Sequence, residues 1–276
     1  MTESQDFSSF QLDPRILDAI KAMGYVSPTP IQAKAIPLVL AGRDVMGAAQ
    51  TGTGKTAGYG LPMLQRILPK ANTSASPARH PVRALILAPT RELADQVNEN
   101  LVAYAAKTGL RVGVVYGGVD IRPQSDMLRR GIEVLTATPG RLLDHIEQKA
   151  VNLSQVEIVV LDEADRMLDM GFYDDIMQIV KYLPKERQTI MFSATMPAKI
   201  QQLANTILNN PAEVKLAVSR PAEKIVQAAY VCYENQKLGI IRSLFAEQTP
   251  ERVIIFASSK LKVKEVTKAL KMMKLN

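Results

Sequence analysis

One short glycine-rich segment of this sequence ends in lysine and threonine, a combination suited to binding phosphate groups. The segment reads AAQTGTGKT over residues 48–56 and overlaps the end of the apolar stretch DVMGAA at 44–49. Glycines allow backbone N–H groups to converge on phosphate oxygens, a lysine reaches the β- and γ-phosphates, and a hydroxyl binds Mg²⁺. We therefore predict that Lys55 contacts phosphate and that Thr56 is a magnesium ligand. Ala49 stands where the strict P-loop pattern has glycine, and the alternative is a glycine-rich turn that binds nothing.

A pair of adjacent carboxylates could complete such a site. LDEAD at 161–165 directly follows the apolar run VEIVV at 156–160, so Asp162 should emerge at the carboxyl end of a strand. In P-loop nucleotide hydrolases an aspartate in this place helps to hold Mg²⁺, and a neighbouring residue orients the attacking water. We predict Asp162 on the metal side and Glu163 as the catalytic carboxylate. The alternative is the start of a helix, where negative charge suits the positive end of the helix dipole.

These chemical groups need a scaffold, and the apolar segments of the sequence predict one. Several short segments are almost continuously apolar rather than alternating, which is typical of strands covered on both faces. They lie at 83–89, 111–116, 132–137, 156–163, 188–195 and 252–259, with helical patterns such as 92–107 and 140–149 between them. This alternation predicts an α/β fold with a doubly wound, mostly parallel sheet. Ligands bind outside the carboxyl ends of such strands, where this sequence has its small and polar clusters.

Two stretches of the sequence have the composition of connectors. KANTSASPARHP at 70–81 is rich in Ala, Ser and Pro, and SRPAEK at 219–224 follows a short apolar segment. We predict a first domain over 1–218, a linker over 219–227, and over 228–276 the start of a second α/β domain in the order strand, helix, strand, helix. A segment of that size is marginal on its own. We expect it to be disordered, to pack abnormally, or to self-associate through exposed strand edges.

The composition narrows the class of protein. The 276 residues include 34 Lys and Arg and 27 Asp and Glu, a net charge of +7, which favours an anionic partner without naming one. Residues 221–276 hold 10 of the basic and 5 of the acidic side chains, so most of the excess lies outside the first domain. The single cysteine, Cys232, excludes an internal disulfide. No apolar run of about 18 residues and no signal peptide is present, so we expect no membrane partner and a cytoplasmic location.

Taken together, these motifs resemble those of the DEAD-box RNA helicases, over nearly the whole chain. AQTGTGKT (49–56), DEAD (162–165) and SAT (193–195) are similar to the first three motifs of that family. PTREL (89–93), the pair Gly117 and Gly118, and TPGR (138–141) are similar to its RNA-facing motifs. GYVSPTPIQ (24–32), with Phe7 upstream, is similar to its adenine-recognition segment. The amino-acid sequences of segments 50–64 and 161–172 look most like those of the bacterial RhlE-type branch of the family.

The resemblance implies a RecA-like P-loop domain that binds ATP with Mg²⁺. It assigns Gln32 to the adenine edge, although Thr29 to Gln32 also reads locally as a helix capping box with proline at the first position. It implies Lys55, Asp162 and Glu163 as catalytic residues, with Thr56 and Asp162 on Mg²⁺. The implied nucleotide-binding set is Phe7, Tyr25, Ser27, Gln32, Ala49, Gln50, Thr51, Gly52, Thr53, Gly54, Lys55 and Thr56.

The same resemblance implies RNA as the macromolecular partner, and ribonucleoprotein or RNA-degradation assemblies as further partners. Ser193 and Thr195 would couple the γ-phosphate state to strain in the RNA, although both could simply cap the chain after a strand. Phosphate contacts position a strand without reading its bases, so we expect sequence-independent binding. Thr138 could be no more than a helix N-cap. The implied RNA-binding residues are Pro89, Thr90, Arg91, Gly117, Gly118, Thr138, Pro139, Gly140 and Arg141.

Members of this family complete the site with a second RecA-like domain, whose late motifs supply arginines to the transition state. Residues 252–259 resemble the first conserved motif of that domain, and no arginine-finger segment follows them in this sequence. Such an arginine is worth about 10³ to 10⁵ in turnover. We therefore expect the chain to bind ATP or ADP with Mg²⁺ but to hydrolyse ATP and unwind duplexes poorly. A P-loop GTPase would require an N-K-x-D element, which is absent, whereas an ATP-dependent RNA clamp and a DNA substrate remain alternatives.

Overall fold

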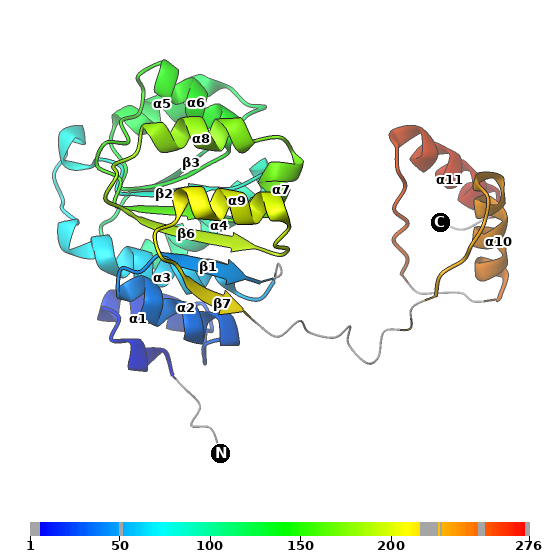
Figure 1. Ribbon diagram of the computed structural model, residues 1–276, viewed down its shortest axis with the longest axis horizontal. Helices are drawn as coiled ribbons and strands as arrows, with labels where there is room; N and C mark the ends of the chain where they lie inside the picture. The colour runs from blue at the N-terminus through cyan, green and yellow to red at the C-terminus, as the bar shows by residue number, and fades with distance from the viewer. Residues whose placement is uncertain (1–5, 50–51, 216–225, 227, 248–251, 274–276) are drawn as a thin grey trace. The chain divides into compact units, whose positions relative to one another are not determined.

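The computed structural model of the chain describes residues 6–49, 52–215, 226, 228–247 and 252–273 (Figure 1). The chain divides into two compact units, Met1–Val218 and Ser219–Asn276. The predicted site residues all belong to the first unit. Gln50 and Thr51 of the predicted nucleotide-binding set lie outside the described residues, as does most of the predicted linker.

A seven-stranded sheet forms the centre of the first unit. Its strands lie in the order β3-β4-β2-β5-β6-β1-β7, and every neighbouring pair is parallel. The prediction of a doubly wound parallel sheet is confirmed. Six of its strands fall within the predicted apolar segments of this unit, whereas β7, which is only partly buried, was not predicted. The bounds are β1 Val45–Ala48, β2 Ala84–Leu87, β3 Val112–Val115, β4 Val134–Ala137, β5 Ile158–Leu161, β6 Gln188–Ser193 and β7 Ala212–Lys215.

Helices cover both faces of this sheet, and side-chain alternation along the strands divides the core into two layers. In β5, Ile158 and Val160 join the cluster that contains α1 to α4, while Val159 and Leu161 join the cluster that contains α5 to α9. Burial on both faces explains why the strands are continuously apolar. The helices are α1 Pro14–Ala22, α2 Pro30–Leu40, α3 Lys55–Ile67, α4 Arg91–Ala105, α5 Ile121–Arg129, α6 Pro139–Glu147, α7 Ala164–Asp169, α8 Tyr173–Lys181 and α9 Ala198–Ile207.

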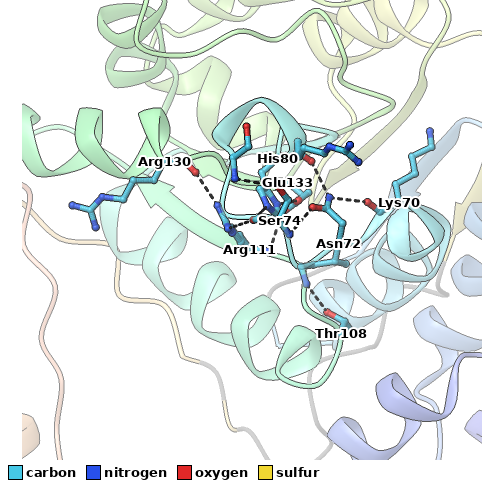
Figure 2. A network of polar contacts seen from close by, with 11 residues as sticks. Lys70, Asn72, Ser74, His80, Thr108, Arg111, Arg130 and Glu133 are labelled. Carbon is cyan, nitrogen blue, oxygen red and sulfur yellow. Dashed lines mark hydrogen bonds and ion pairs between the residues drawn. The ribbon is translucent and has the colours of Figure 1, made fainter.

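The predicted loop at 70–81 is anchored by a buried polar network (Figure 2). His80 and Glu133 are fully buried and paired through Nδ1 and Oε1. The Nε2 atom of His80 lies 2.7 Å from the carbonyl oxygen of Ser74, and the backbone N–H of Arg111 donates to Glu133 Oε2 at 2.9 Å. Both ring nitrogens of His80 therefore lie within hydrogen-bonding distance of an oxygen atom. The network fixes the chain just before β2 and β4 begin.

The second unit contains the two predicted helices but not the two predicted strands. α10 spans Lys237–Glu247 and α11 spans Lys260–Met272, with a short 3₁₀ turn at Glu234–Gln236. Residues 228–233 and 252–257 form no strand in the structure, so this part of the prediction is wrong. A strand is held by the hydrogen bonds of a neighbouring strand, and within the described residues neither segment has one. Val231, Ile254 and Phe256 consequently remain exposed.

Among the described helices, none combines the length and the apolar character needed to cross a bilayer.

Candidate functional site

The predicted site residues that follow strands lie together at the carboxyl edge of the sheet, because all seven strands run in the same direction. β5, β6 and β1 are neighbours and lead into the DEAD segment, the SAT segment and the P-loop. β3, β4 and β2 are neighbours and lead into the Gly117–Gly118 turn, the TPGR segment and the PTREL segment. The predicted nucleotide and RNA residues thus occupy adjacent halves of one edge, which meet where β2 pairs with β5.

Lys55 and Asp162 form a buried ion pair at the centre of the nucleotide half. Lys55 Nζ lies 3.2 Å from Asp162 Oδ1, and the two side chains are 6% and 2% exposed. The other carboxylate oxygen, Oδ2, accepts a hydrogen bond of 2.9 Å from the hydroxyl of Tyr59. Burial, followed by the charge of Asp162, raises the pKa of Tyr59 well above its usual value, so this hydroxyl keeps its proton and donates. Within the described residues, Lys55 Nζ makes no hydrogen bond.

The glycines of the P-loop adopt conformations that other residues rarely adopt. Gly52 has φ +84° and Gly54 has φ +87°. A Cβ atom on Gly54 would lie 2.5 Å from Nε2 of Gln32, whereas a Cβ on Gly52 would meet nothing within 4 Å. The loop is therefore closed on the side of Gln32 and open at Gly52. An anion that enters the open side would reach the backbone N–H groups and the buried ammonium of Lys55.

The segment at 24–32 packs against this loop through two side chains. The hydroxyl of Thr29 donates to the carbonyl oxygen of Thr53 at 2.9 Å, and Nε2 of Gln32 donates to that of Gly54 at 3.1 Å. The backbone N–H of Thr29 donates to Oε1 of Gln32 at 2.9 Å, as in a capping box. Gln32 therefore has a local structural role beside the P-loop, and its contact with adenine stays a prediction. Sequence reasoning did not single out Thr29 as a P-loop contact.

The predicted aromatic residues lie together near the start of the chain. The rings of Phe7 and Tyr25 are stacked with centroids 6.0 Å apart, and Phe7 is buried. The hydroxyl groups of Tyr25 and Tyr104 are 2.9 Å apart and hydrogen-bonded. Ser27 is exposed in the loop between Tyr25 and α2. Tyr25 is half-buried and presents the more accessible aromatic surface of the pair.

Glu163, the predicted catalytic carboxylate, has a strained backbone. Its φ and ψ are +52° and +52°, the left-handed region that residues with a Cβ rarely occupy. Its side chain is largely buried, and Oε2 lies 3.4 Å from Nη1 of Arg166. Strain of this kind costs on the order of 1–3 kcal/mol and is concentrated at functional sites. The strained turn brings Glu163 to the carboxyl end of β5, next to the buried Lys55–Asp162 pair.

Asp165 links the DEAD segment to the SAT segment. Its Oδ2 accepts hydrogen bonds of 2.8 Å from both the backbone N–H and the hydroxyl of Thr195. Ser193 Oγ accepts from the backbone N–H of Asp165 at 3.2 Å and donates to the carbonyl oxygen of Thr195 at 2.7 Å. Partial burial raises the pKa of Asp165, but the hydrogen bonds from Thr195 and Ser193 outweigh it, so the net shift is downward. Sequence reasoning gave Asp165 no role, although it lies within the DEAD motif.

In the RNA half, the exposed Arg91 begins α4 at the carboxyl end of β2. Its guanidinium lies over the ring of Tyr116, with Cζ 5.2 Å from the centroid. Thr90 caps α4, because its hydroxyl oxygen accepts from the backbone N–H of Leu93 at 3.3 Å. Pro89, in contrast, is buried. Arg91 is therefore the cation that this segment offers to a phosphate.

Arg141 has a different environment. Its Nη2 donates to the carbonyl oxygen of Val119 at 3.0 Å, its Nε lies 3.3 Å from Asp144, and its side chain is only 10% exposed. Arg141 thus ties the turn that follows Gly118 to α6. Thr138 makes no side-chain capping bond and is buried, as is its neighbour Pro139, whereas Gly140 is partly exposed. The exposed surface here is largely backbone, and a phosphate contact by the Arg141 side chain stays a prediction.

The residues present fit a magnesium–nucleotide complex. No group of three or more His, Cys, Asp and Glu residues in the described part of the chain could hold a metal ion by itself. Mg²⁺ in phosphate sites is typically bound by one or two protein oxygens together with the substrate phosphates. Asp162 and the partly exposed Thr56 offer this small donor set, and the ammonium of Lys55 offers a countercharge to phosphate.

Comparison with known proteins identifies the family. The DEAD/DEAH box helicase family matches residues 29–203. The chain is 43% identical over 267 residues to the ATP-dependent RNA helicase CshA of Listeria monocytogenes, covering 96% of this chain and 50% of that protein. It is 41% identical over 261 residues to the DEAD-box ATP-dependent RNA helicase RhpA of Helicobacter pylori, covering 94% and 51%.

The chain spans about half the length of the curated relatives it matches. The names of these relatives do not include the RhlE-type branch, and that finer assignment stays a prediction. The family match covers well over half of the chain and includes both the P-loop and the DEAD segment. This protein therefore belongs to the DEAD/DEAH box helicase family.

Proposed function

We propose that this protein binds ATP with Mg²⁺ at the β5–β6–β1 half of the sheet edge and RNA phosphates at the β3–β4–β2 half, as an ATP-dependent RNA helicase. The buried Lys55–Asp162 pair is the observation that carries the proposal. It places the P-loop ammonium against the first carboxylate of the DEAD segment, where phosphate and Mg²⁺ would separate them. The comparisons support the helicase activity through the names of relatives about twice as long.

Different residues of the chain would bind the phosphates, hold the metal and orient the attacking water. Bound Mg²⁺ would neutralise charge on the phosphates. Lys55 would turn from Asp162 to the β- and γ-phosphates, and Thr56 and Asp162 would hold the metal. Glu163 would orient the attacking water and accept its proton at a carboxylate oxygen.

The step that carries the γ-phosphate state beyond the nucleotide itself is proposed to begin at Asp165. Its carboxylate holds Thr195, and Ser193 closes the same network, so the ends of β5 and β6 are tied together. A change at the γ-phosphate that moves Glu163 would also move Asp165, two residues away. This would carry the nucleotide state to the start of α7 and the SAT segment.

RNA would bind through its backbone rather than its bases. The exposed Arg91 and the backbone N–H groups of the Gly117–Gly118 turn supply the contacts, and neither reads a base. We propose RNA rather than DNA as the nucleic acid. Ribonucleoprotein or RNA-degradation assemblies, and a second copy of the chain held through residues 228–276, are the further proposed partners.

The RNA assignment is tested by anisotropy of a labelled single-stranded RNA, measured with a non-hydrolysable ATP analogue and Mg²⁺ at several salt concentrations. R91A should weaken binding and lower the salt-dependence slope by about one unit, because one phosphate contact is lost. The matched control is R43A, which removes an exposed arginine just before β1, at the opposite edge of the sheet. Equal effects of the two substitutions, or equal affinity for DNA of the same sequence, would contradict the assignment.

A further inference from the structure

The hydroxyl of Tyr59 contacts Asp162, one of the two residues predicted to hold magnesium. It donates to Oδ2 of Asp162 at 2.9 Å. Tyr59 is fully buried. It lies one helical turn after Lys55 on α3, so both side chains leave the same face of the helix and reach the same carboxylate. Tyr59 and Lys55 therefore contact the two oxygens of one predicted metal ligand, Asp162.

The ring of Tyr59 is held in place by packing against β6. Its centroid lies 5.9 Å from that of Phe192, the residue just before Ser193. Phe192 in turn lies across β1 at Gly47, where an added Cβ would come within 2.2 Å of the ring. Glycine is thus the only residue type at position 47 that leaves room for the ring of Phe192. The hydroxyl of Tyr59 has a fixed position relative to the sheet because its ring cannot shift.

We propose that Tyr59 is a positioning residue that orients Asp162 toward magnesium. This inference rests on the proposed function. In the structure each carboxylate oxygen has its own partner, Oδ1 the ammonium of Lys55 and Oδ2 the hydroxyl of Tyr59. When Lys55 turns to the phosphates, Oδ1 is released while Tyr59 still holds Oδ2. The carboxylate therefore keeps its orientation with one oxygen free for the metal.

The test uses the ratio of two affinities rather than catalytic activity. Binding of a fluorescent ADP to the full chain is measured in excess EDTA and in saturating Mg²⁺, and the ratio of the two dissociation constants gives the magnesium coupling. Y59F removes only the hydroxyl and should reduce this coupling about 10-fold, the lower end of the effect of losing a hydrogen bond to a metal ligand. The affinity in EDTA should stay within about threefold of the native value, because Tyr59 contacts Asp162 rather than the phosphates.

Two controls separate positioning from general packing. Y104F also removes one hydroxyl from a buried tyrosine, but that hydroxyl pairs with Tyr25 and not with Asp162, so the magnesium coupling should be retained. In a D162N background, Y59F should have no additional effect, because the two residues act through one contact. Thermal unfolding of each variant shows that it is folded at the temperature of the titrations.

The possible results separate a failure of the role of Tyr59 from a failure of the proposed function. If Y59F shows the same magnesium coupling as the native chain, the proposed function is not overturned but the role of Tyr59 is. A reduction by Y59F that persists in D162N would also overturn it, since the effect would then not pass through Asp162. Absence of any magnesium effect in the native chain would overturn the proposed function, and the role of Tyr59 with it.

Discussion

Replacing Asp162 with asparagine should make the chain bind ATP more tightly when magnesium is absent. In the structure, Lys55 is paired with Asp162 and must leave it to reach a phosphate. D162N removes the competing charge and nearly preserves the volume of the side chain. The substitution thus frees the ammonium that the phosphates need, while it removes a ligand that the metal needs.

The size of this effect follows from the geometry of the pair. At the observed separation of 3.2 Å, and with an effective dielectric constant of about 20, two unit charges attract by about 5 kcal/mol. Only part of this energy is recovered, because asparagine keeps an oxygen that accepts hydrogen bonds from Lys55 or Tyr59. We expect a gain of about 1.4–2.8 kcal/mol, which is about 10-fold to 100-fold in affinity.

Titration with a fluorescent ATP analogue in excess EDTA measures this gain directly. Repeating the titration in saturating Mg²⁺ should show the reverse order, with the native chain gaining affinity and D162N gaining little. D18N is a matched control, because Asp18 is an exposed residue on α1 paired only with Lys107 in the described residues. If D162N binds ATP in EDTA no more tightly than the native chain or D18N, the Lys55–Asp162 pair does not compete with phosphate and the reasoning is refuted.

Two further predictions concern stability and pH. E133A should lower the free energy of unfolding by about 1–3 kcal/mol for each of the two groups that lose their partner, the ring of buried His80 and the backbone N–H of Arg111. E157A, at a partly exposed ion pair, should cost less than about 1 kcal/mol. Urea unfolding followed by circular dichroism compares the two variants, and equal costs would contradict the role of the buried network. Asp165 has a pKa below its ordinary 3.8, since the hydrogen bonds from Thr195 outweigh the opposing effect of burial. The stabilisation it provides is present above that ordinary value and is lost as the pH falls through the lowered pKa, so the stability difference between the native chain and T195A should shrink there. A difference that stays constant on acidification would be inconsistent with this.

Much of the fold and the site could be predicted because the hydrophobic pattern of a strand and the spacing of a motif are each visible within a short segment of sequence. Runs such as Ile158–Leu161 are apolar throughout because both faces of the sheet are covered, and this pattern placed β5 and its neighbours correctly. Once the strands are parallel, their carboxyl ends share one edge, which brings Lys55 and Asp162 together across more than a hundred residues of sequence. Spacing and topology are sufficient for that part of the site.

Other features depend on side-chain directions that no local pattern contains. Arg141 turns back to the carbonyl oxygen of Val119, and nothing in TPGR indicates this. The donation from Tyr59 to Asp162 follows from its position one turn after Lys55, but only the fold shows that both reach β5. The strands predicted at 228–233 and 252–259 failed because apolar character favours a strand without supplying a neighbour for its hydrogen bonds.

Equilibrium binding of ATP in the presence of Mg²⁺ to the native chain and to K55Q tests the central claim most directly. Glutamine can still hydrogen-bond Asp162 but brings no charge to the phosphates. The control K34Q removes an exposed lysine of α2 that donates to the backbone of Lys215. We predict that K55Q loses at least about 100-fold in affinity, as expected for a charge-assisted phosphate contact, while K34Q binds like the native chain. Equal affinities of the native chain and K55Q would show that this P-loop is not the nucleotide site.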